Sequence, residues 1–241
     1  MGHKHKLQRF AENETFANVL QPEFSEVFRC DYKLKNQWKQ EFWHNNNPIV
    51  LELGCGKGEY TVQLAQKYPN KNFIGIDIKG ARFWRGAKTA IEQQIPNAAF
   101  IRSRIEFLNS FFAANEISEI WITFPDPQLE KRRTKKRLTS PRFLNMYQKM
   151  LAPNASVHLK TDSRELHEYT KNLLQFNNQK IIRATGDLYN SPLADDTLSI
   201  KTFYEQHYLE QGKTITYIEF SLNGQTIIDL PEKEEKIIFN F

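Results

Sequence analysis

The chain has 241 residues, of which 40% are apolar, 13% aromatic and 25% charged. This composition is typical of one larger globular domain, or one domain with short additions, and it excludes a disordered chain, a collagen-like repeat and a coiled coil. No stretch approaches the ~18 consecutive apolar residues of a membrane span, and the polar first twenty residues contain no signal-peptide core. Two cysteines, Cys30 and Cys55, are too few for a disulfide framework or a zinc cluster. We therefore expect reduced thiols, no metal and no membrane anchor in a cytoplasmic protein.

The charge is concentrated at one place in the sequence. Lys and Arg number 33 against 28 Asp and Glu, a net charge of +5. Residues 130–137, here called the basic segment, hold six basic residues and one acidic one, so this segment alone equals the whole excess. Such density favours contact with a polyanion, with a merely solvated face as the alternative. The expected phosphate contacts are Lys131, Arg132, Arg133, Lys135, Lys136 and Arg137. A weaker basic cluster lies at residues 3–9.

Apolar runs and amphipathic segments alternate along most of the chain. Residues 1–47 are interpreted as a polar N-terminal extension with a helical stretch, followed by a single domain over residues 48–241. The expected strands cover residues 49–53, 72–76, 98–101, 119–124 and 156–160. The expected helices cover residues 59–68, 81–94, a segment through Phe143, Tyr147 and Met150 that stops at Pro153, and 164–176. This alternation predicts right-handed crossovers and a parallel sheet.

The C-terminal part departs from this alternation. Residues 180–184 and 214–222 are predicted strands with only a long loop between them, which implies an antiparallel pair at the edge of the sheet. The expected fold is therefore α/β: a Rossmann-like, doubly wound, mostly parallel seven-stranded sheet with a reversed last strand. Residues 236–241 are a candidate for one more short strand.

A glycine-rich turn follows the first strand and opens the first helix. Gly54, Gly56 and Gly58 have the spacing G-x-G-x-G, whereas a dinucleotide fingerprint would need glycine where the chain has Glu59. A carboxylate there would oppose a pyrophosphate at the helix N-terminus, so the expected ligand is a nucleoside without phosphates. S-adenosylmethionine fits, because its positive sulfonium and amine suit the acidic Glu52.

Two aspartates follow later strands of the expected sheet. Asp77 ends the second strand, where its two oxygens can accept hydrogen bonds from both ribose hydroxyls of the donor. Asp126 lies between two prolines after the fourth strand, so it is expected to face the methyl donor at the carboxyl edge of the sheet. A proline-framed surface turn is the alternative interpretation of Asp126.

Together these motifs resemble the bacterial tRNA (guanine-N7-)-methyltransferase family of class I S-adenosylmethionine-dependent methyltransferases. The resemblance covers roughly residues 40–222 and rests on motifs in the family's order. They are the glycine loop at 52–58, Gly75-Ile76-Asp77, Pro125-Asp126-Pro127 with its basic tail, Lys160-Thr161-Asp162, and Thr202-Phe203-Tyr204-Glu205 followed by Gly212.

The resemblance implies methyl transfer to N7 of guanine in the tRNA variable loop, at position 46. It also implies roles for individual residues. The donor-site residues would be Glu52, Gly54, Gly56, Asp77, Arg104 and Asp126, with Asp126 as the catalytic residue. The guanine-side residues would be Asp162, Thr202, Phe203, Tyr204 and Glu205.

The chain departs from the family pattern at three positions. The family's acidic residue beside the adenine falls at Arg104, its tryptophan after Asp-Pro at Gln128, and its lysine four residues after the aspartate at Glu130. The displaced Glu106 and the adjacent Lys131 are the candidates to take over two of these roles.

The chemistry of N7 methylation agrees with the residues present. Guanine N7 carries a lone pair and no proton, so alignment with the methyl group and exclusion of water suffice without a general base. Asp126 is then an orienting acceptor, and Asp162 and Glu205 suit guanine's N–H donors. For Asp162 a capping box with Glu165 is an alternative.

Three other functions stay open at this point. They are a methyltransferase of the same fold that acts on another nucleic-acid base, one that acts on a small molecule, and a non-catalytic RNA-binding protein. The sequence leaves a monomer and a homodimer equally open.

Overall fold

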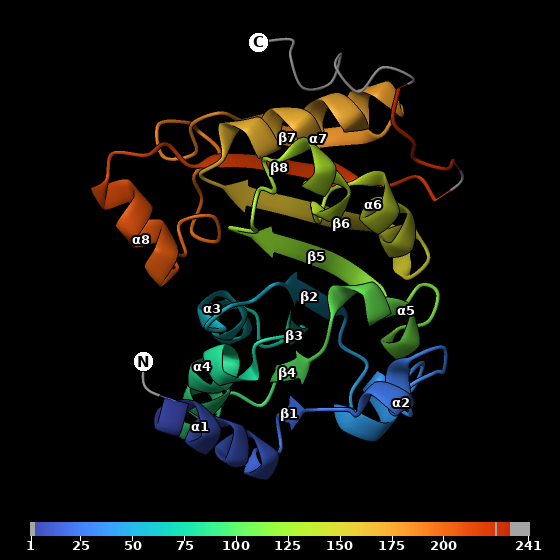
Figure 1. The fold of residues 1–241 in the computed structure, drawn as a ribbon, viewed down its shortest axis with the longest axis vertical. Coiled ribbons are helices and arrows are strands. Elements are labelled where there is room, and N and C mark those ends of the chain that lie inside the picture. The colour runs from blue at the N-terminus through green and yellow to red at the C-terminus, as the bar shows by residue number, and fades with distance from the viewer. Residues whose placement is uncertain (1–2, 225, 232–241) are drawn as a thin grey trace. The chain divides into compact units, whose positions relative to one another are not determined.

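The computed structural model describes residues 3–224 and 226–231. The chain forms two compact units, Met1–Ile120 and Trp121–Phe241, and the boundary falls within strand β5 (Figure 1). Each unit is described by itself below. Residues 236–241, the candidate for a further strand, lie outside the described residues.

The first unit contains the glycine loop and the strands that carry it. Its strands are hydrogen-bonded in the order β1-β4-β3-β2, and the β1–β4, β4–β3 and β3–β2 pairs are parallel. The elements are α1 (His3–Thr15), β1 (Val19–Leu20), α2 (Phe24–Val27), the π-helix η1 (Trp38–Phe42), β2 (Ile49–Leu53), α3 (Glu59–Lys67), β3 (Asn72–Asp77), α4 (Gly80–Glu92), β4 (Ala98–Arg102), the 3-10 turn η2 (Ile105–Phe107), α5 (Leu108–Phe111) and the start of β5 (Ile117–Thr123).

Strand β2 and most of β3 are buried, which explains why they read as short continuous apolar runs rather than alternating ones. Helix α4 turns Phe83 toward the sheet, where its ring stacks on Phe100 of β4 at 5.6 Å between centroids. The neighbouring small residues Gly86 and Ala87 are also buried, so the opposite face of α4 remains for polar side chains. The predicted strand–helix alternation is confirmed here.

The N-terminal segment adds a strand that the sequence does not predict. Val19 pairs with Phe100 and Leu20 with Ile101, so β1 extends the sheet beyond β4. The side-chain amide of Asn13 in α1 donates to the carbonyl of Gly80 at 3.0 Å and joins α1 to the start of α4. The described sheet therefore has eight strands and not seven. A two-residue strand carries no detectable hydrophobic period, which is why the sequence does not reveal it.

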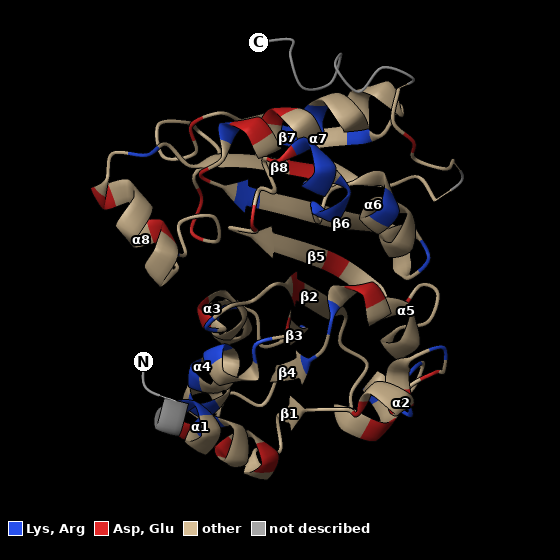
Figure 2. Cartoon of the chain, in the orientation of Figure 1, with Lys and Arg blue, Asp and Glu red and all other residues tan. Residues whose placement is uncertain are grey.

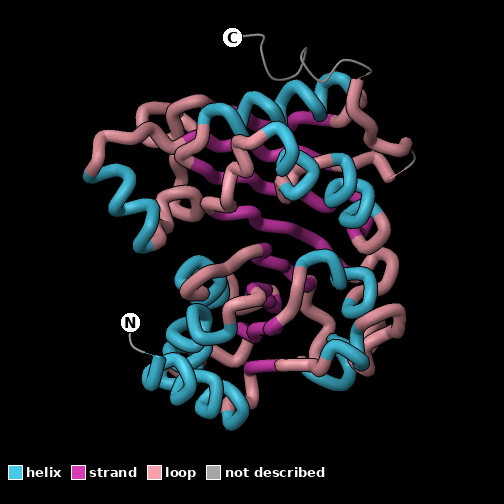
Figure 3. Tube along the Cα trace, in the orientation of Figure 1, coloured by secondary structure: helices cyan, strands magenta, loops and turns pink. Residues whose placement is uncertain are grey.

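The second unit carries the remaining strands in the order β5-β6-β8-β7. Strand β8 is antiparallel to both β6 and β7, so the predicted reversed last strand is confirmed. Figure 3 shows these strands with the helices and long loops around them. The elements are the 3-10 turn η3 (Lys131–Lys136), α6 (Pro141–Gln148), β6 (Leu151–Thr161), α7 (Arg164–Phe176), β7 (Lys180–Thr185), α8 (Phe203–Glu210) and β8 (Thr216–Ser221).

Helix α8 lies within the segment that the sequence predicts to be a loop. Among the described side chains of α8 only Glu205 is buried, so the helix has no apolar stripe by which to recognise it. Across residues 3–224 and 226–231 no helix has the length and apolar character needed to cross a membrane. The fold is thus a mostly parallel, Rossmann-like α/β sheet with one reversed strand.

Candidate functional site

The glycine loop joins β2 to α3 and is tied to the end of β3. Gly54, Gly56 and Gly58 have φ angles of 75°, 56° and 73°, in the left-handed region that favours glycine. The backbone amides of Gly54 and Cys55 both donate to the carbonyl of Ile76, at 2.8 and 3.1 Å. These bonds hold the loop across the carboxyl ends of two adjacent parallel strands.

The glycines of this loop differ in what surrounds them. A Cβ atom at Gly58 would lie 2.5 Å from Cε1 of Phe100, so Gly58 is required for packing between the loop and the sheet. A Cβ atom at Gly56 would meet only the carbonyl oxygen of Gly54, at 4.0 Å. The space beside Gly56 is therefore open, and the backbone there can be approached by a ligand.

Asp77 ends β3 directly beside this open space. Its Oδ2 accepts a hydrogen bond from the amide of Gly56 at 3.0 Å, and its Oδ1 accepts one from the amide of Lys79 at 2.8 Å. Each carboxylate oxygen has a further lone pair. The half-buried carboxylate is thus held by the backbone on one side and can accept two hydroxyl groups on the other. This pair of acceptor oxygens fits the two hydroxyl groups of a ribose.

Glu52 is bonded within the fold. Its side chain is 3% exposed, and its Oε2 accepts from the amide of Thr61 at 2.8 Å and from the Thr61 hydroxyl. Thr61 lies in the first turn of α3, whose amides lack partners inside the helix. The carboxylate therefore stabilises the start of α3, and direct contact between Glu52 and a donor stays a prediction.

Cys55 is buried next to two carboxylates. Burial, and then the negative charges of Glu52 and Asp77, raise the pKa of its thiol well above the ordinary value. A thiol that stays protonated is a poor nucleophile. Cys55 thus acts as a small packing residue of the loop.

Arg104 occupies the position after β4 where the resemblance implies an adenine contact. Its side chain is exposed, and it precedes the 3-10 turn η2. Glu106 in that turn is exposed as well. The geometry of neither residue identifies it as the contact for the adenine ring of the donor, so both contacts stay predictions.

In the second unit, Asp126 lies in a tightly shaped loop after β5. Phe124 and Gln128, on either side of it, have φ angles of 48° and 49°, which are unfavourable for residues with a Cβ atom. The Asp126 side chain is 65% exposed, its Oδ1 accepts from the amide of Gln128 at 3.1 Å, and its Oδ2 lies 3.9 Å from Nη2 of Arg133. The loop presents this carboxylate to solvent in a strained backbone.

The basic segment contains exposed cations, the half-buried Arg133 beside Asp126 and Glu130, and one fully buried arginine. Lys131, Arg132, Lys135 and Lys136 are exposed. Arg137 is 0% exposed: its Nε donates to the carbonyl of Pro127 at 3.0 Å, its Nη2 pairs with Glu165 at 2.9 Å, and its guanidinium lies over the ring of Tyr169.

The structure therefore places Arg137 inside the fold, where it holds the loop after Asp126. Spacing alone gives all six cations of the basic segment the same role. Glu130, which stands where the family has a lysine, bonds to Arg132 at 2.7 Å.

A buried ionic cluster joins β6 to α8. Nζ of Lys160 donates to Oε1 of Glu205 at 2.8 Å and to the carbonyls of Leu198 and Ile200, at 2.6 and 2.9 Å. The hydroxyl of Tyr189 donates to the same Oε1 at 2.6 Å.

Both members of this ion pair are fully buried. Burial lowers the pKa of Lys160, against the effect of Glu205, and burial together with the Glu205 bond raises the pKa of Tyr189. The sequence singles out Glu205 but not Tyr189, because the two are brought together only by the fold.

The remaining guanine-side residues lie around this cluster. Thr202 caps α8 by accepting from the amide of Glu205 at 3.2 Å, while Phe203 and Tyr204 expose their rings to solvent. Asp162 accepts from Nζ of Lys213 at 2.8 Å. Ser163, not Asp162, caps α7, so the capping-box alternative for Asp162 is wrong.

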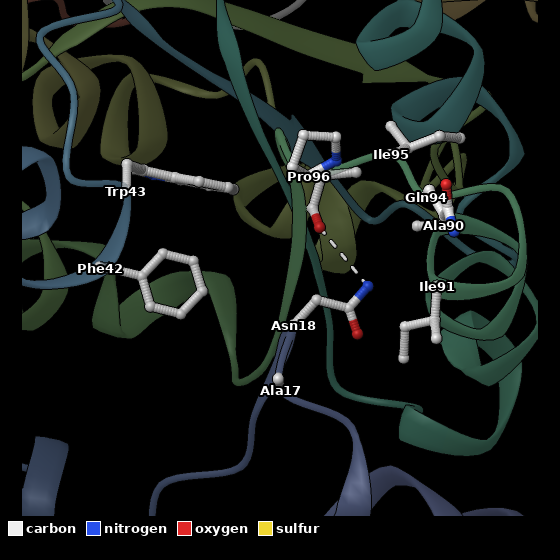
Figure 4. Close-up of a pocket in the computed structure, with 10 residues that line it drawn as sticks. Ala17, Asn18, Phe42, Trp43, Ala90, Ile91, Gln94, Ile95 and Pro96 are labelled. Atoms are coloured by element: carbon white, nitrogen blue, oxygen red, sulfur yellow. Dashed lines mark hydrogen bonds between the residues drawn. The ribbon is translucent and has the colours of Figure 1, made fainter.

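A cavity of about 390 Å³ lies elsewhere in the first unit (Figure 4). It is lined by residues such as Asn18, Trp43, Ile91 and Ala98. Ala98 begins β4, whereas Asp77 ends the parallel strand β3, so the cavity lies at the opposite end of the strands from the glycine loop. Among the described residues, no group of His, Cys, Asp and Glu side chains is arranged to hold a metal ion.

Comparisons with known proteins agree with this geometry. Residues 46–218 match the model of a family described as "Putative methyltransferase". The tRNA (guanine-N(7)-)-methyltransferase of Christiangramia forsetii is 55% identical over 92% of this chain and 100% of the relative. The protein of the same name from Bacteroides thetaiotaomicron is 47% identical over 96% of this chain and 91% of the relative.

A solved structure with a similar fold is the 16S rRNA methyltransferase KamB. Its TM-score is 0.57 at 14% identity, and the match covers 75% of this chain and 90% of that one. At that identity the likeness concerns the fold alone. The identity to the curated relatives and the match over residues 46–218 show that the chain belongs to the tRNA (guanine-N(7)-)-methyltransferase family.

Proposed function

We propose that this protein transfers the methyl group of S-adenosylmethionine to N7 of a guanine in the variable loop of tRNA, at position 46. The observation that carries the proposal is the 55% identity to a relative of that name over its whole length, together with the donor geometry at Gly56 and Asp77. A tRNA substrate favours the cytoplasm. We assign the methyltransferase domain to residues 48–241, preceded by the extension 1–47.

The donor half of the proposal rests on the first unit. Asp77 is held by two backbone amides with lone pairs left for the ribose hydroxyls, and the open space at Gly56 lets a nucleoside approach the loop. When bound, the donor supplies an electrophilic methyl group on a positively charged sulfur. The loop's task is to fix the position of that group, because alignment is the main requirement of a direct displacement.

The acceptor half needs no proton transfer before the methyl moves. The N7 lone pair forms the new N–C bond, and the electrons of the C–S bond remain on sulfur. Asp126 is 65% exposed at the end of β5, where a carboxylate can orient a base and stabilise the positive charge that develops on it. Arg137 holds the neighbouring Pro127 carbonyl from inside the fold and thereby positions this loop.

Recognition of guanine is assigned to the residues around α8. Asp162 offers carboxylate oxygens to N–H donors, and the exposed rings of Phe203 and Tyr204 offer surfaces for base stacking. Glu205 anchors the segment through Lys160 and Tyr189. The exposed cations of the basic segment are assigned to tRNA phosphates.

The test is a methylation assay with labelled S-adenosylmethionine and tRNA, followed by nucleoside analysis. We expect the label in 7-methylguanosine. A matched substrate carries 7-deazaguanine at position 46, where a C–H group replaces N7, and it should accept no label while it still binds.

Label on an exocyclic amine, on a ribose or on the 7-deazaguanine tRNA would contradict the assignment. A protein that binds tRNA but shows neither a thermal shift with the donor nor transfer would be a non-catalytic RNA-binding protein. A donor at 100 times its dissociation constant should add about 2.7 kcal/mol of stability.

A further inference from the structure

A second concentration of positive charge lies in the first unit, far in sequence from the basic segment. Residues 79–104 contain six basic residues and one acidic one, the same balance as the basic segment. Because these cations are spread over a helix and a strand, they do not form a run in the sequence. We call the set of six the cationic ridge: Lys79, Arg82, Arg85, Lys88, Arg102 and Arg104.

The cationic ridge begins at the carboxyl edge of β3 and β4 and continues along α4. Lys79 follows Asp77 by two residues, and Arg102 is paired in register with Asp77. Arg82, Arg85 and Lys88 follow one another at intervals of three along α4, so they form one stripe on its surface. Figure 2 colours the Lys and Arg positions along α4 blue.

Most of these side chains are free of competing carboxylates. Lys79, Arg82, Arg85, Arg102 and Arg104 are exposed, and none of the described carboxylates forms an ion pair with them. Lys88 differs, because it lies 3.6 Å from Glu12, which also accepts from Nε1 of Trp84 and joins α1 to α4. The guanidinium of Arg102 lies over the ring of Phe10 at 4.6 Å, which leaves its charge uncompensated. Solvated cations without ion-pair partners repel one another unless an anion lies between them.

The N-terminus of α4 lies beside the ridge but is not a free positive end. No acidic residue occupies its first turn, but the Asp77 carboxylate accepts from the amide of the N-cap residue Lys79 at 2.8 Å. The positive potential therefore comes from the side chains, which suit phosphate groups spaced along a nucleic-acid strand. We infer that the cationic ridge is a second tRNA-binding surface, which holds the phosphate backbone next to the donor loop.

This inference rests on the proposed function and adds a surface to it. It predicts that the cations of the cationic ridge, and not the basic segment alone, contribute to the salt dependence of tRNA affinity. The test measures tRNA binding by the full chain across a salt series. The variant R82Q/R85Q removes two exposed charges that make no described contact within the fold.

Each lost phosphate contact should reduce the slope of log affinity against log salt by about 0.7–0.9, so the double variant should lose about 1.4–1.8. If the affinities converge at 1 M salt, this corresponds to an affinity about 25- to 60-fold lower at 0.1 M. R82K/R85K keeps the charge and should keep the slope. The control K33Q/K149Q removes two exposed charges outside both basic stretches and should also keep it.

A wild-type slope in R82Q/R85Q, or an equal reduction in the control, would overturn the inference. So would weaker binding at an unchanged slope, or a loss of donor affinity by calorimetry, which would place these arginines in the donor site. Failure of the proposed function is distinguishable, because the wild-type protein itself would then bind no tRNA or would produce another nucleoside.

Discussion

The two units differ in the charged side chains that they bury. In the described part of the first unit the buried charged side chain is Glu52, which accepts from the amide and the hydroxyl of Thr61. The second unit buries Arg137, Lys160, Glu205 and Glu219, and each has a partner of opposite charge. We explain this difference by the kind of segment that carries the functional residues in each unit.

In the first unit the functional loop is short and spans two parallel strands, so backbone hydrogen bonds hold it. In the second unit the functional residues lie on long connections, such as residues 186–202, where no sheet ladder exists. A buried ion pair with correct hydrogen bonds specifies one arrangement of such a connection, at a cost in desolvation. We therefore expect substitutions of buried ions to affect the second unit most.

The largest effect is expected at the ion pair between β6 and α8. Lys160→Met should lower the free energy of unfolding by about 3–5 kcal/mol, because it leaves the Glu205 carboxylate buried without its cation. The measurement is urea denaturation. Lys149→Met, at an exposed position, should cost less than about 0.5 kcal/mol.

Removing both charges gives the internal control. The double variant K160M/E205Q should be more stable than K160M alone, because no unpaired charge remains buried. If K160M costs less than about 1 kcal/mol, the second unit does not depend on this pair and the comparison fails.

An intermediate effect is expected in the first unit, where packing and not charge is critical. Gly58→Ala should lower the free energy of unfolding by about 2–4 kcal/mol, because its Cβ meets Phe100 and its φ is positive. Gly56→Ala has the same backbone constraint but open space, so it should cost about 1–2 kcal/mol.

The substitution at Gly56 is also expected to affect binding of the methyl donor. Gly56→Ala should weaken binding of S-adenosylmethionine, measured by calorimetry on folded protein, because its methyl group enters the space beside Asp77. Equal stability losses, or donor affinity intact in Gly56→Ala, would show that the open space is not the donor site.

The smallest effect on stability is expected in the basic segment, at Lys136, whereas its neighbour Arg137 should contribute to stability. Arg137→Met should lower the free energy of unfolding by about 2 kcal/mol, through its lost bonds to Pro127 and Glu165. Lys136→Met should leave stability unchanged and instead reduce the salt slope of tRNA binding by about 0.7–0.9. Both variants lose one positive charge. If they changed the free energy of unfolding and the salt slope in the same way, burial would not distinguish the roles of Arg137 and Lys136.

Much of the fold could be predicted from local pattern. The strand–helix alternation from residue 49 to residue 176 and the reversed strand β8 are confirmed, because their apolar runs have lengths and periods typical of these elements. Strand β1 and helix α8 are absent from the prediction. The first is too short to show a period, and the second buries only the carboxylate of Glu205 among its described residues.

The candidate site divides in the same way. The residues themselves determine the glycine loop, Asp77 at a strand end and the family to which the chain belongs, because these depend on residue type and spacing. Only the tertiary structure separates Gly56 from Gly58, places Arg137 inside and Lys136 outside, and joins Lys160, Tyr189 and Glu205. The physical reason is that burial and ion pairing are relations between residues distant in the chain, which spacing along the sequence does not encode.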